Sequence, residues 1–181
     1  ISDIFEVELR PSEQTADALY DEISDRLASA EFRPRALLRR FGIDVLATTD
    51  DPCDDLEAHA TVRRAGDVSA RVVPTFRPDR YLEPGRHDWP ALVDALGAAA
   101  DVDTDSYEGF IRALEIRRAH FVDHGAVSTD HSHSDLVTLT LDAGESRRIF
   151  SAARGSSATE ADVHMAFDVI TEIGTRMKVQ K

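Results

Sequence analysis

Three short apolar runs, separated by helical segments, constrain the fold of this chain more than any other feature. The runs cover residues 43–48, 71–76 and 126–130. Their length and composition are typical of buried strands, and helices between successive strands predict parallel βαβ units. We therefore expect a chain of the α/β class. Only three strands are visible, and a barrel needs eight, so the pattern alone leaves an open sheet and a barrel as alternatives.

Capping residues mark the helices that follow the first two runs. Asp54 is expected to cap a helix over residues 55–64, which Gly66 ends. Pro74 lies in the second run and lacks the amide hydrogen that a central strand needs, so we place it at a strand end or a bulge. The later helices are predicted over residues 89–100 and 106–124, from Asp142 with Glu145 in a capping box, and from about Thr159.

The first 41 residues are predicted to be helical. Apolar residues recur there at helical spacing: Ala16, Leu19, Tyr20, Ile23 and Leu27. Pro34 suits the first turn of a second helix, over residues 34–41. We therefore divide the chain into a helical segment, residues 1–41, and an α/β region that ends in helices, residues 42–181.

Charge and cysteine content restrict function and location. The formal net charge of −13 disfavours binding to nucleic acid and to anionic membrane surfaces. No apolar run is long enough to span a membrane. The single cysteine, Cys53, cannot form an internal disulfide, which favours a reducing compartment and hence the cytoplasm. Beyond its presence, nothing supports Cys53 as a nucleophile.

Each of the three apolar runs leads into polar, ionisable residues. The first is followed by Thr49-Asp50-Asp51, the second by Arg77-Pro78-Asp79, and the third ends in Asp130-His131-Ser132-His133. Because chemistry in parallel α/β folds collects at the carboxyl ends of the strands, we expect these residues to converge on one rim.

Structural and functional interpretations compete at several of these positions. Asp50 and Asp51 suit the capping of a following helix better than direct catalysis. Arg77 and Asp79 suit a loop ion pair and a functional site equally well. His131 and His133 would share one face of a strand, as metal ligands do, and Asp135 could join them.

Three other positions are expected to be structural. His59 lies inside a predicted helix, where a packing or surface role is the simpler interpretation than ligation. Trp89 is expected to anchor packing at a helix start. The cluster of Arg112, Arg117 and Arg118 is expected to form a solvated helix face.

Three phrases together resemble one known family. "FGIDVLATTDDPCDDLEAH", "RVVPTFRPDRYLEP" and "HGAVSTDHSHSD" are similar, in order and spacing, to the uronate isomerases of the amidohydrolase superfamily. The resemblance covers roughly residues 30–160. It implies part of a distorted (β/α)8 TIM-like barrel with an added helical region, to which residues 1–41 would belong.

The resemblance also implies a reaction and roles for particular residues. The family interconverts D-glucuronate with D-fructuronate, and D-galacturonate with D-tagaturonate, by moving a proton between C2 and C1. Arg77 of "FRPD" matches the family's active-site arginine and would orient the substrate. Asp130 of "STDH" matches its active-site aspartate and would be the acid/base group or its close partner. His131 is a further substrate-binding candidate.

The departures from the family imply an incomplete site. The family's metal ligands, a His-x-His pair and a later aspartate, are not matched in this sequence, so a divalent metal such as zinc would have its ligands outside this chain. We expect a central slice of the enzyme that has no activity alone and that associates through unpaired strand edges as a homo-oligomer. The alternatives are a non-catalytic binding module and a metal-dependent hydrolase that uses His131 and His133.

Overall fold

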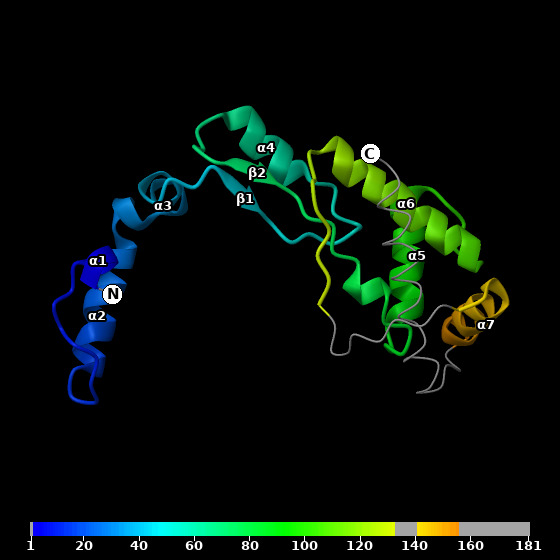
Figure 1. The fold of residues 1–181 in the computed structure, drawn as a ribbon, viewed down its shortest axis with the longest axis horizontal. Helices are drawn as coiled ribbons and strands as arrows, with labels where there is room; N and C mark the ends of the chain where they lie inside the picture. The colour runs from blue at the N-terminus through cyan, green and yellow to red at the C-terminus, as the bar shows by residue number, and fades with distance from the viewer. Residues whose placement is uncertain (1, 133–140, 156–181) are drawn as a thin grey trace. The chain divides into compact units, whose positions relative to one another are not determined.

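The computed structural model describes residues 2–132 and 141–155 (Figure 1). The chain divides into two compact units. The first comprises residues 1–46 with 61–72, and the second comprises residues 47–60 with 73–181. The domain boundary that the sequence predicts, between residues 41 and 42, stays a prediction.

The first unit begins with the helices that the sequence predicts. They are α2 (Ala16–Ala28) and α3 (Pro34–Arg40), which Pro34 begins, and α1 (Ser2–Phe5) and the 3-10 helix η1 (Ala30–Phe32) accompany them. The expectation that all of residues 1–41 are helical is wrong at residues 6–15, which form no helix. Phe5 stacks on Phe32 with ring centroids 5.1 Å apart. The apolar stripe of α2 is only partly buried: Leu19 is covered, whereas Tyr20 and Leu27 are 72% and 51% exposed.

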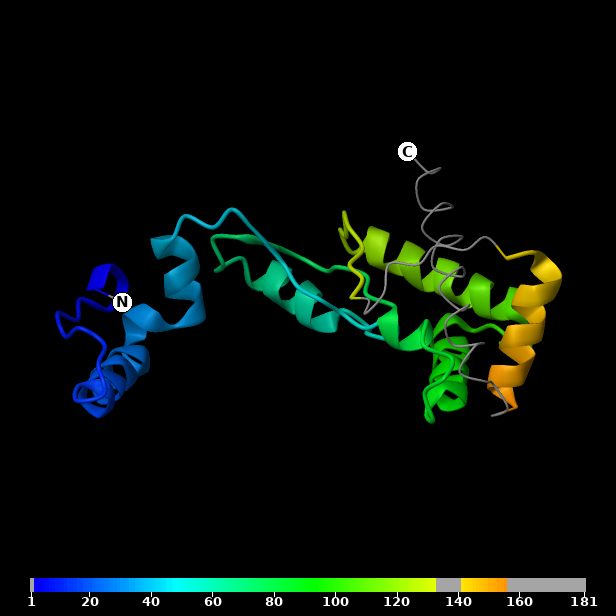
Figure 2. The same ribbon diagram turned by 60° about the horizontal axis from the view of Figure 1, so that its bottom comes forward.

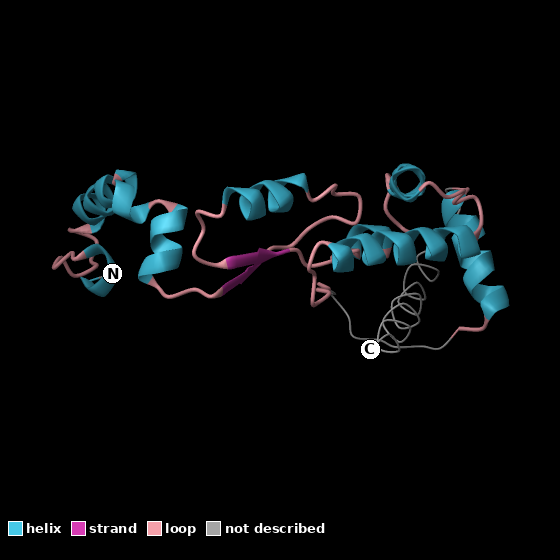
Figure 3. Cartoon of the chain, turned by 90° about the horizontal axis from the view of Figure 1, so that it is seen from above, coloured by secondary structure: helices cyan, strands magenta, loops and turns pink. Residues whose placement is uncertain are grey.

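The sheet consists of two short parallel strands, β1 (Val45–Ala47) and β2 (Arg71–Val73), joined by α4 (Glu57–Ala65). Figure 3 shows the two strands side by side and α4 alongside them. Pro74 directly follows β2, which confirms its predicted place at a strand end. The expectation that the first run is buried is wrong, because all three residues of β1 are exposed.

The third apolar run does not form a strand of its own. Within the described residues, parallel pairing continues past β2 as single bridges, from Asp50 to Phe76 and from Phe76 to Thr129. Val127, within the run, is 73% exposed. The predicted strand over residues 126–130 is therefore reduced to one bridged residue, although its parallel direction and its place beside the second run are as expected.

The core of the second unit is built by three helices that follow the sheet. They are α5 (Trp89–Ala100), α6 (Tyr107–Asp123) and α7 (Ala143–Arg154), and α7 packs against both α5 and α6 (Figure 2). Trp89 confirms its predicted anchoring role: its ring lies 5.8 Å from Phe110 and 5.5 Å from Phe150. Its indole Nε1 donates to the carbonyl of Tyr81 at 2.8 Å.

Arg117 corrects the expectation of a solvated arginine face on α6. Its side chain is buried, whereas that of Arg112 is exposed. Nε donates to the carbonyl of Pro52 and one terminal nitrogen donates to the carbonyl of Asp54, each at 2.7 Å. Arg117 therefore joins α6 to the loop that follows β1. The pattern missed this because an arginine on a helix usually keeps its charged end in water.

Helices and one small parallel sheet place the chain in the α/β class. None of the described helices combines the length and the apolar composition that crossing a bilayer requires. The helix predicted from Thr159 lies outside the described residues.

Candidate functional site

Backbone hydrogen bonds hold the ends of the three runs side by side. The amide of Asp50 donates to Thr75, and the amide of Arg77 donates back to Asp50, both at 3.1 Å. The amide of Asp130 donates to the carbonyl of Phe76 at 3.1 Å. This parallel register brings the polar residues after each run to one edge, as the sequence analysis expects.

Arg77 and Asp130 face each other at this edge. Arg77 Nη1 lies 3.6 Å from Asp130 Oδ2, and the two side chains are 36% and 49% exposed. Arg77 Nε donates to Asp79 Oδ2 at the shorter distance of 2.8 Å. The hydrogen bond to Asp79, followed by the negative charge of Asp130, raises the pKa of the guanidinium. A fixed cation beside a half-exposed carboxylate can bind and polarise an acidic, hydroxylated ligand.

Asp79 contacts Arg77 and also the two residues that follow Asp130. Its Oδ2 also accepts the amide hydrogen of Ser132 at 2.9 Å. Its Oδ1 lies 3.4 Å from His131 Nδ1, so His131 is part of the same cluster. Arg77, Asp130 and His131 are thus brought together by Asp79, for which the sequence left an ion pair and a functional role open.

Asp50 joins the strand ends and does not cap a helix. Its Oδ2 accepts from the Thr48 hydroxyl at 2.7 Å and from the Thr75 amide at 3.1 Å. The same hydroxyl lies 2.8 Å from Nε2 of His59, a buried residue of α4. The packing role expected of His59 agrees with this position, whereas the capping role of Asp50 is wrong.

The amides at the start of α4 are bound by other acids. Asp54 accepts from the amide of Leu56 at 2.7 Å, and Asp55 accepts from that of Glu57 at 2.9 Å. Leu56 has a left-handed backbone, with φ of 60°. Because this conformation cannot continue a right-handed helix, α4 begins at Glu57, two residues later than the sequence predicts.

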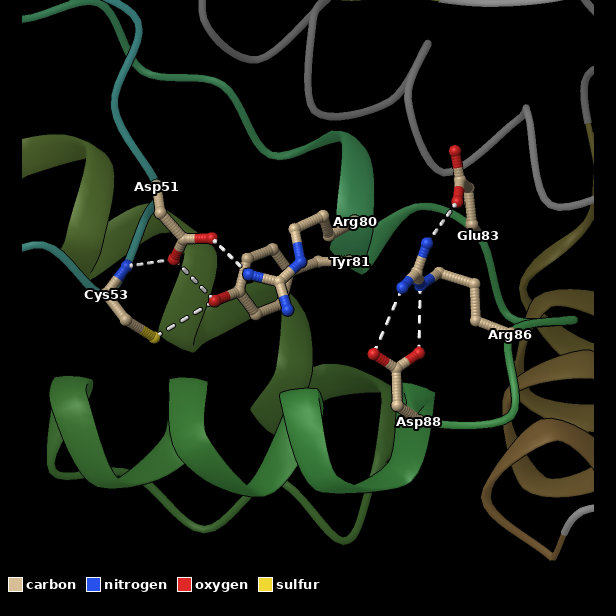
Figure 4. A network of polar contacts seen from close by, with 7 residues as sticks. All are labelled: Asp51, Cys53, Arg80, Tyr81, Glu83, Arg86 and Asp88. Atoms are coloured by element: carbon tan, nitrogen blue, oxygen red, sulfur yellow. Dashed lines mark hydrogen bonds and ion pairs between the residues drawn. The ribbon is translucent and has the colours of Figure 1, made fainter.

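Asp51 forms a second network, with Tyr81, Cys53 and Arg80 (Figure 4). Its Oδ1 accepts from the Tyr81 hydroxyl at 2.7 Å and from the Cys53 amide at 2.9 Å. Its Oδ2 lies 3.3 Å from Arg80 Nη1. These contacts tie the loop after the first run to η2 (Asp79–Tyr81), the turn that carries Asp79. The capping role predicted for Asp51 is therefore wrong, and the role of Tyr81 was not visible in the sequence.

Cys53 sits in this network as a neutral thiol. Its Sγ lies 3.1 Å from the Tyr81 hydroxyl oxygen. Burial, above all, raises the pKa of Cys53 and also that of Tyr81, so both groups stay protonated at neutral pH. A protonated thiol is a poor nucleophile, so the structure offers Cys53 no catalytic activation.

Metal-ligating residues do not gather in the part of the chain that the structure describes. No three His, Cys, Asp or Glu side chains among residues 2–132 and 141–155 lie close enough to share a metal ion. His133 and Asp135, which the metal hypothesis for His131 requires, lie outside the described residues.

The comparisons with known proteins agree in family. The sequence model of the family described as glucuronate isomerase matches residues 1–178. The curated uronate isomerase of Cutibacterium acnes is 47% identical over 156 residues, which are 86% of this chain and 33% of that protein. The uronate isomerase of Rhizorhabdus wittichii is 44% identical with the same coverage. The chain thus spans about a third of the length of the curated relatives it matches.

Two solved structures share the fold of this chain. The crystal structure of glucuronate isomerase from Caulobacter crescentus superposes with a TM-score of 0.87 at 28% identity, covering 99% of this chain and 37% of that one. That of uronate isomerase from Thermotoga maritima gives 0.84 at 28% identity, covering 97% and 39%.

Proposed function

Because this chain belongs to the glucuronate isomerase family, we propose that it supplies Arg77 and Asp130 to the hexuronate site of a uronate isomerase. The observation that carries the proposal is the approach of these two side chains to 3.6 Å, at the edge where the segment after β2 is bridged to Thr129. The names of the relatives support an isomerase and favour neither a hydrolase nor a binding module.

The proposed reaction is aldose–ketose isomerisation of D-glucuronate and D-galacturonate. A proton moves between C2 and C1, which requires an acid/base group near the carbons and an electrophile near the oxygens. Asp130 is the proposed acid/base group or its partner, since its carboxylate is half-exposed. Arg77 binds Asp79 through Nε, so its terminal nitrogens are the donors for the substrate's carboxylate or hydroxyls. His131 is a further substrate-binding residue.

The surroundings of the site follow from the same proposal. We propose that β1, β2 and the bridged segment at Thr129 belong to a (β/α)8 barrel of the amidohydrolase type, and that the N-terminal helices belong to its helical insertion. We further propose that any divalent metal of the site is held by ligands outside this chain. A homo-oligomer located in the cytoplasm, where a lone thiol stays reduced, completes the proposal.

Substitution of the two central residues tests this function. In the full-length polypeptide that carries this sequence, we expect Arg77→Lys and Asp130→Asn each to lower kcat/KM for D-glucuronate by about 100-fold, because lysine lacks the bidentate fork and asparagine cannot accept the proton. The matched control is Arg86→Lys, since Arg86 also pairs with an aspartate two residues on. An Arg77 or Asp130 variant within about threefold of the wild type would contradict the proposal.

A further inference from the structure

We propose that Asp79 is a positioning residue, which holds Arg77 and residues 130–132 in the arrangement that binds substrate. The inference rests on the proposed function, since it concerns the geometry of that site. The sequence pattern left a loop ion pair and a functional site open for Asp79, and the family resemblance gave it no particular role.

Both carboxylate oxygens of Asp79 lie against other residues of the protein. Oδ2 accepts from Arg77 Nε at 2.8 Å and from the Ser132 amide at 2.9 Å, and Oδ1 lies 3.4 Å from His131 Nδ1. The side chain is only 15% exposed. One carboxylate therefore joins the segment after β2 to the segment after the third run, and it has little surface left for a ligand.

Asp79 is itself held on a rigid turn. It begins η2, directly after the fully buried Pro78. Two residues on, Tyr81 is also buried; its hydroxyl donates to Asp51, and its carbonyl accepts from Trp89. A short carboxylate side chain on such a turn has little freedom to move. It can therefore hold the long, flexible side chain of Arg77 in one position.

The distances from Arg77 to Asp79 and to Asp130 show that Asp79 keeps the guanidinium away from Asp130. Arg77 Nε is in hydrogen-bond contact with Asp79 at 2.8 Å, whereas Nη1 stays 3.6 Å from Asp130 Oδ2, beyond good hydrogen-bond length. With its guanidinium bound to Asp79, Arg77 does not close onto Asp130. The carboxylate of Asp130 therefore stays open to the substrate. Among the residues that the structure describes, the acid beside Arg77 other than Asp79 is Asp130 itself.

The test uses the full-length polypeptide and two substitutions. Asp79→Asn keeps the shape of the side chain and removes its charge, and Asp79→Ala removes the contacts altogether. The matched control is Asp88→Asn: Asp88 accepts from Arg86 Nε at 2.9 Å with the same spacing along the chain, and Figure 4 shows the pair in the following loop. The readouts are the crystal structure of each variant, kcat and KM for D-glucuronate, and the melting temperature.

We expect Asp79→Asn to keep the fold, to let Arg77 close onto Asp130, and to lower kcat by about 100-fold, since misplacing a group of the site by about 1 Å costs about that much. Asp88→Asn should leave kcat and KM within about threefold of the wild type. An Asp79→Asn protein with Arg77 in place, or with kcat within about threefold, would overturn the inference. Unfolding of both Asp79 variants would also overturn the inference, because Asp79 would then be needed for the stability of the fold and not for the position of Arg77.

The outcomes separate this inference from the proposed function. If the wild-type full-length polypeptide does not isomerise hexuronates, the proposed function fails. The crystal structures of wild type and Asp79→Asn then still decide whether Asp79 keeps Arg77 away from Asp130.

Discussion

At the scale of one residue, Tyr81 shows that Asp51, an acid after the first apolar run, binds a side chain far along the sequence. Its hydroxyl has one hydrogen and lies 2.7 Å from Asp51 Oδ1 and 3.1 Å from Cys53 Sγ. It therefore donates to the carboxylate, and the thiol can donate to its oxygen. The side chain is only 2% exposed. The Asp51 carboxylate is partly buried, and a partly buried carboxylate that loses such a donor keeps part of the cost of its desolvation.

We therefore expect Tyr81→Phe to lower the free energy of unfolding by about 1–2 kcal/mol. Urea denaturation followed by circular dichroism measures the difference. Tyr20→Phe is the matched control, because Tyr20 is 72% exposed and its hydroxyl should contribute nothing measurable. Equal midpoints for the two variants would show that the contact with Asp51 is not stabilising.

The same network shows which site residues a sequence can predict. The ends of the apolar runs predicted that Arg77 and Asp130 lie at one rim, which is a local property of the sequence, and the family resemblance supplied their roles. The partners of Asp50 and Asp51, namely Thr75 and Tyr81, lie 25 and 30 residues further along the chain. Local patterns suggested helix capping for both acids, because capping is the role that short acids play over short distances.

At the scale of elements, Arg117 is the clearest case of a tie between a helix and a distant loop. Its guanidinium donates to the carbonyls of Pro52 and Asp54, which the loop after β1 turns toward α6. A further contact, at 3.3 Å, reaches the carbonyl of Ala99 at the end of α5. Backbone carbonyls in a loop have no strand or helix partner, so a long cationic side chain satisfies several at once.

We expect Arg117→Met to lower the free energy of unfolding by about 2–4 kcal/mol, since methionine fills similar space and leaves buried carbonyls without donors. Arg112→Met, on the exposed face of the same helix, should change it by less than about 0.5 kcal/mol. Chemical denaturation of both variants gives the comparison. A loss at Arg117 no larger than that at Arg112 would mean that water replaces the guanidinium without cost.

Helices that begin with a capping residue were predicted well. Ser106 caps α6 by accepting from the amide of Gly109, and Asp142 caps α7 by accepting from the amides of Gly144 and Glu145. The strand at residues 126–130 was not predicted correctly, because a strand depends on its neighbours for pairing and burial, which five residues of sequence cannot specify.

At the scale of the whole molecule, exposed apolar residues mark the surface of β1 that no other described segment covers. Val45 and Leu46 of β1 are 48% and 39% exposed, although parallel strands are normally covered on both faces. The barrel proposed above would supply that cover. Sequence periodicity predicted the strand, but it could not show which residues pack against it, because those contacts depend on the assembled fold.

The last prediction concerns the 181-residue chain by itself. Its described residues place one guanidinium and one half-exposed carboxylate at one edge, while the chain spans only about a third of the length of the curated relatives it matches. We therefore expect no detectable conversion of D-glucuronate by this chain, and ready conversion by the full-length polypeptide, in an assay that follows D-fructuronate formation. A reaction without protein gives the background rate. Turnover by the 181-residue chain above that background would show that these residues already form a complete site.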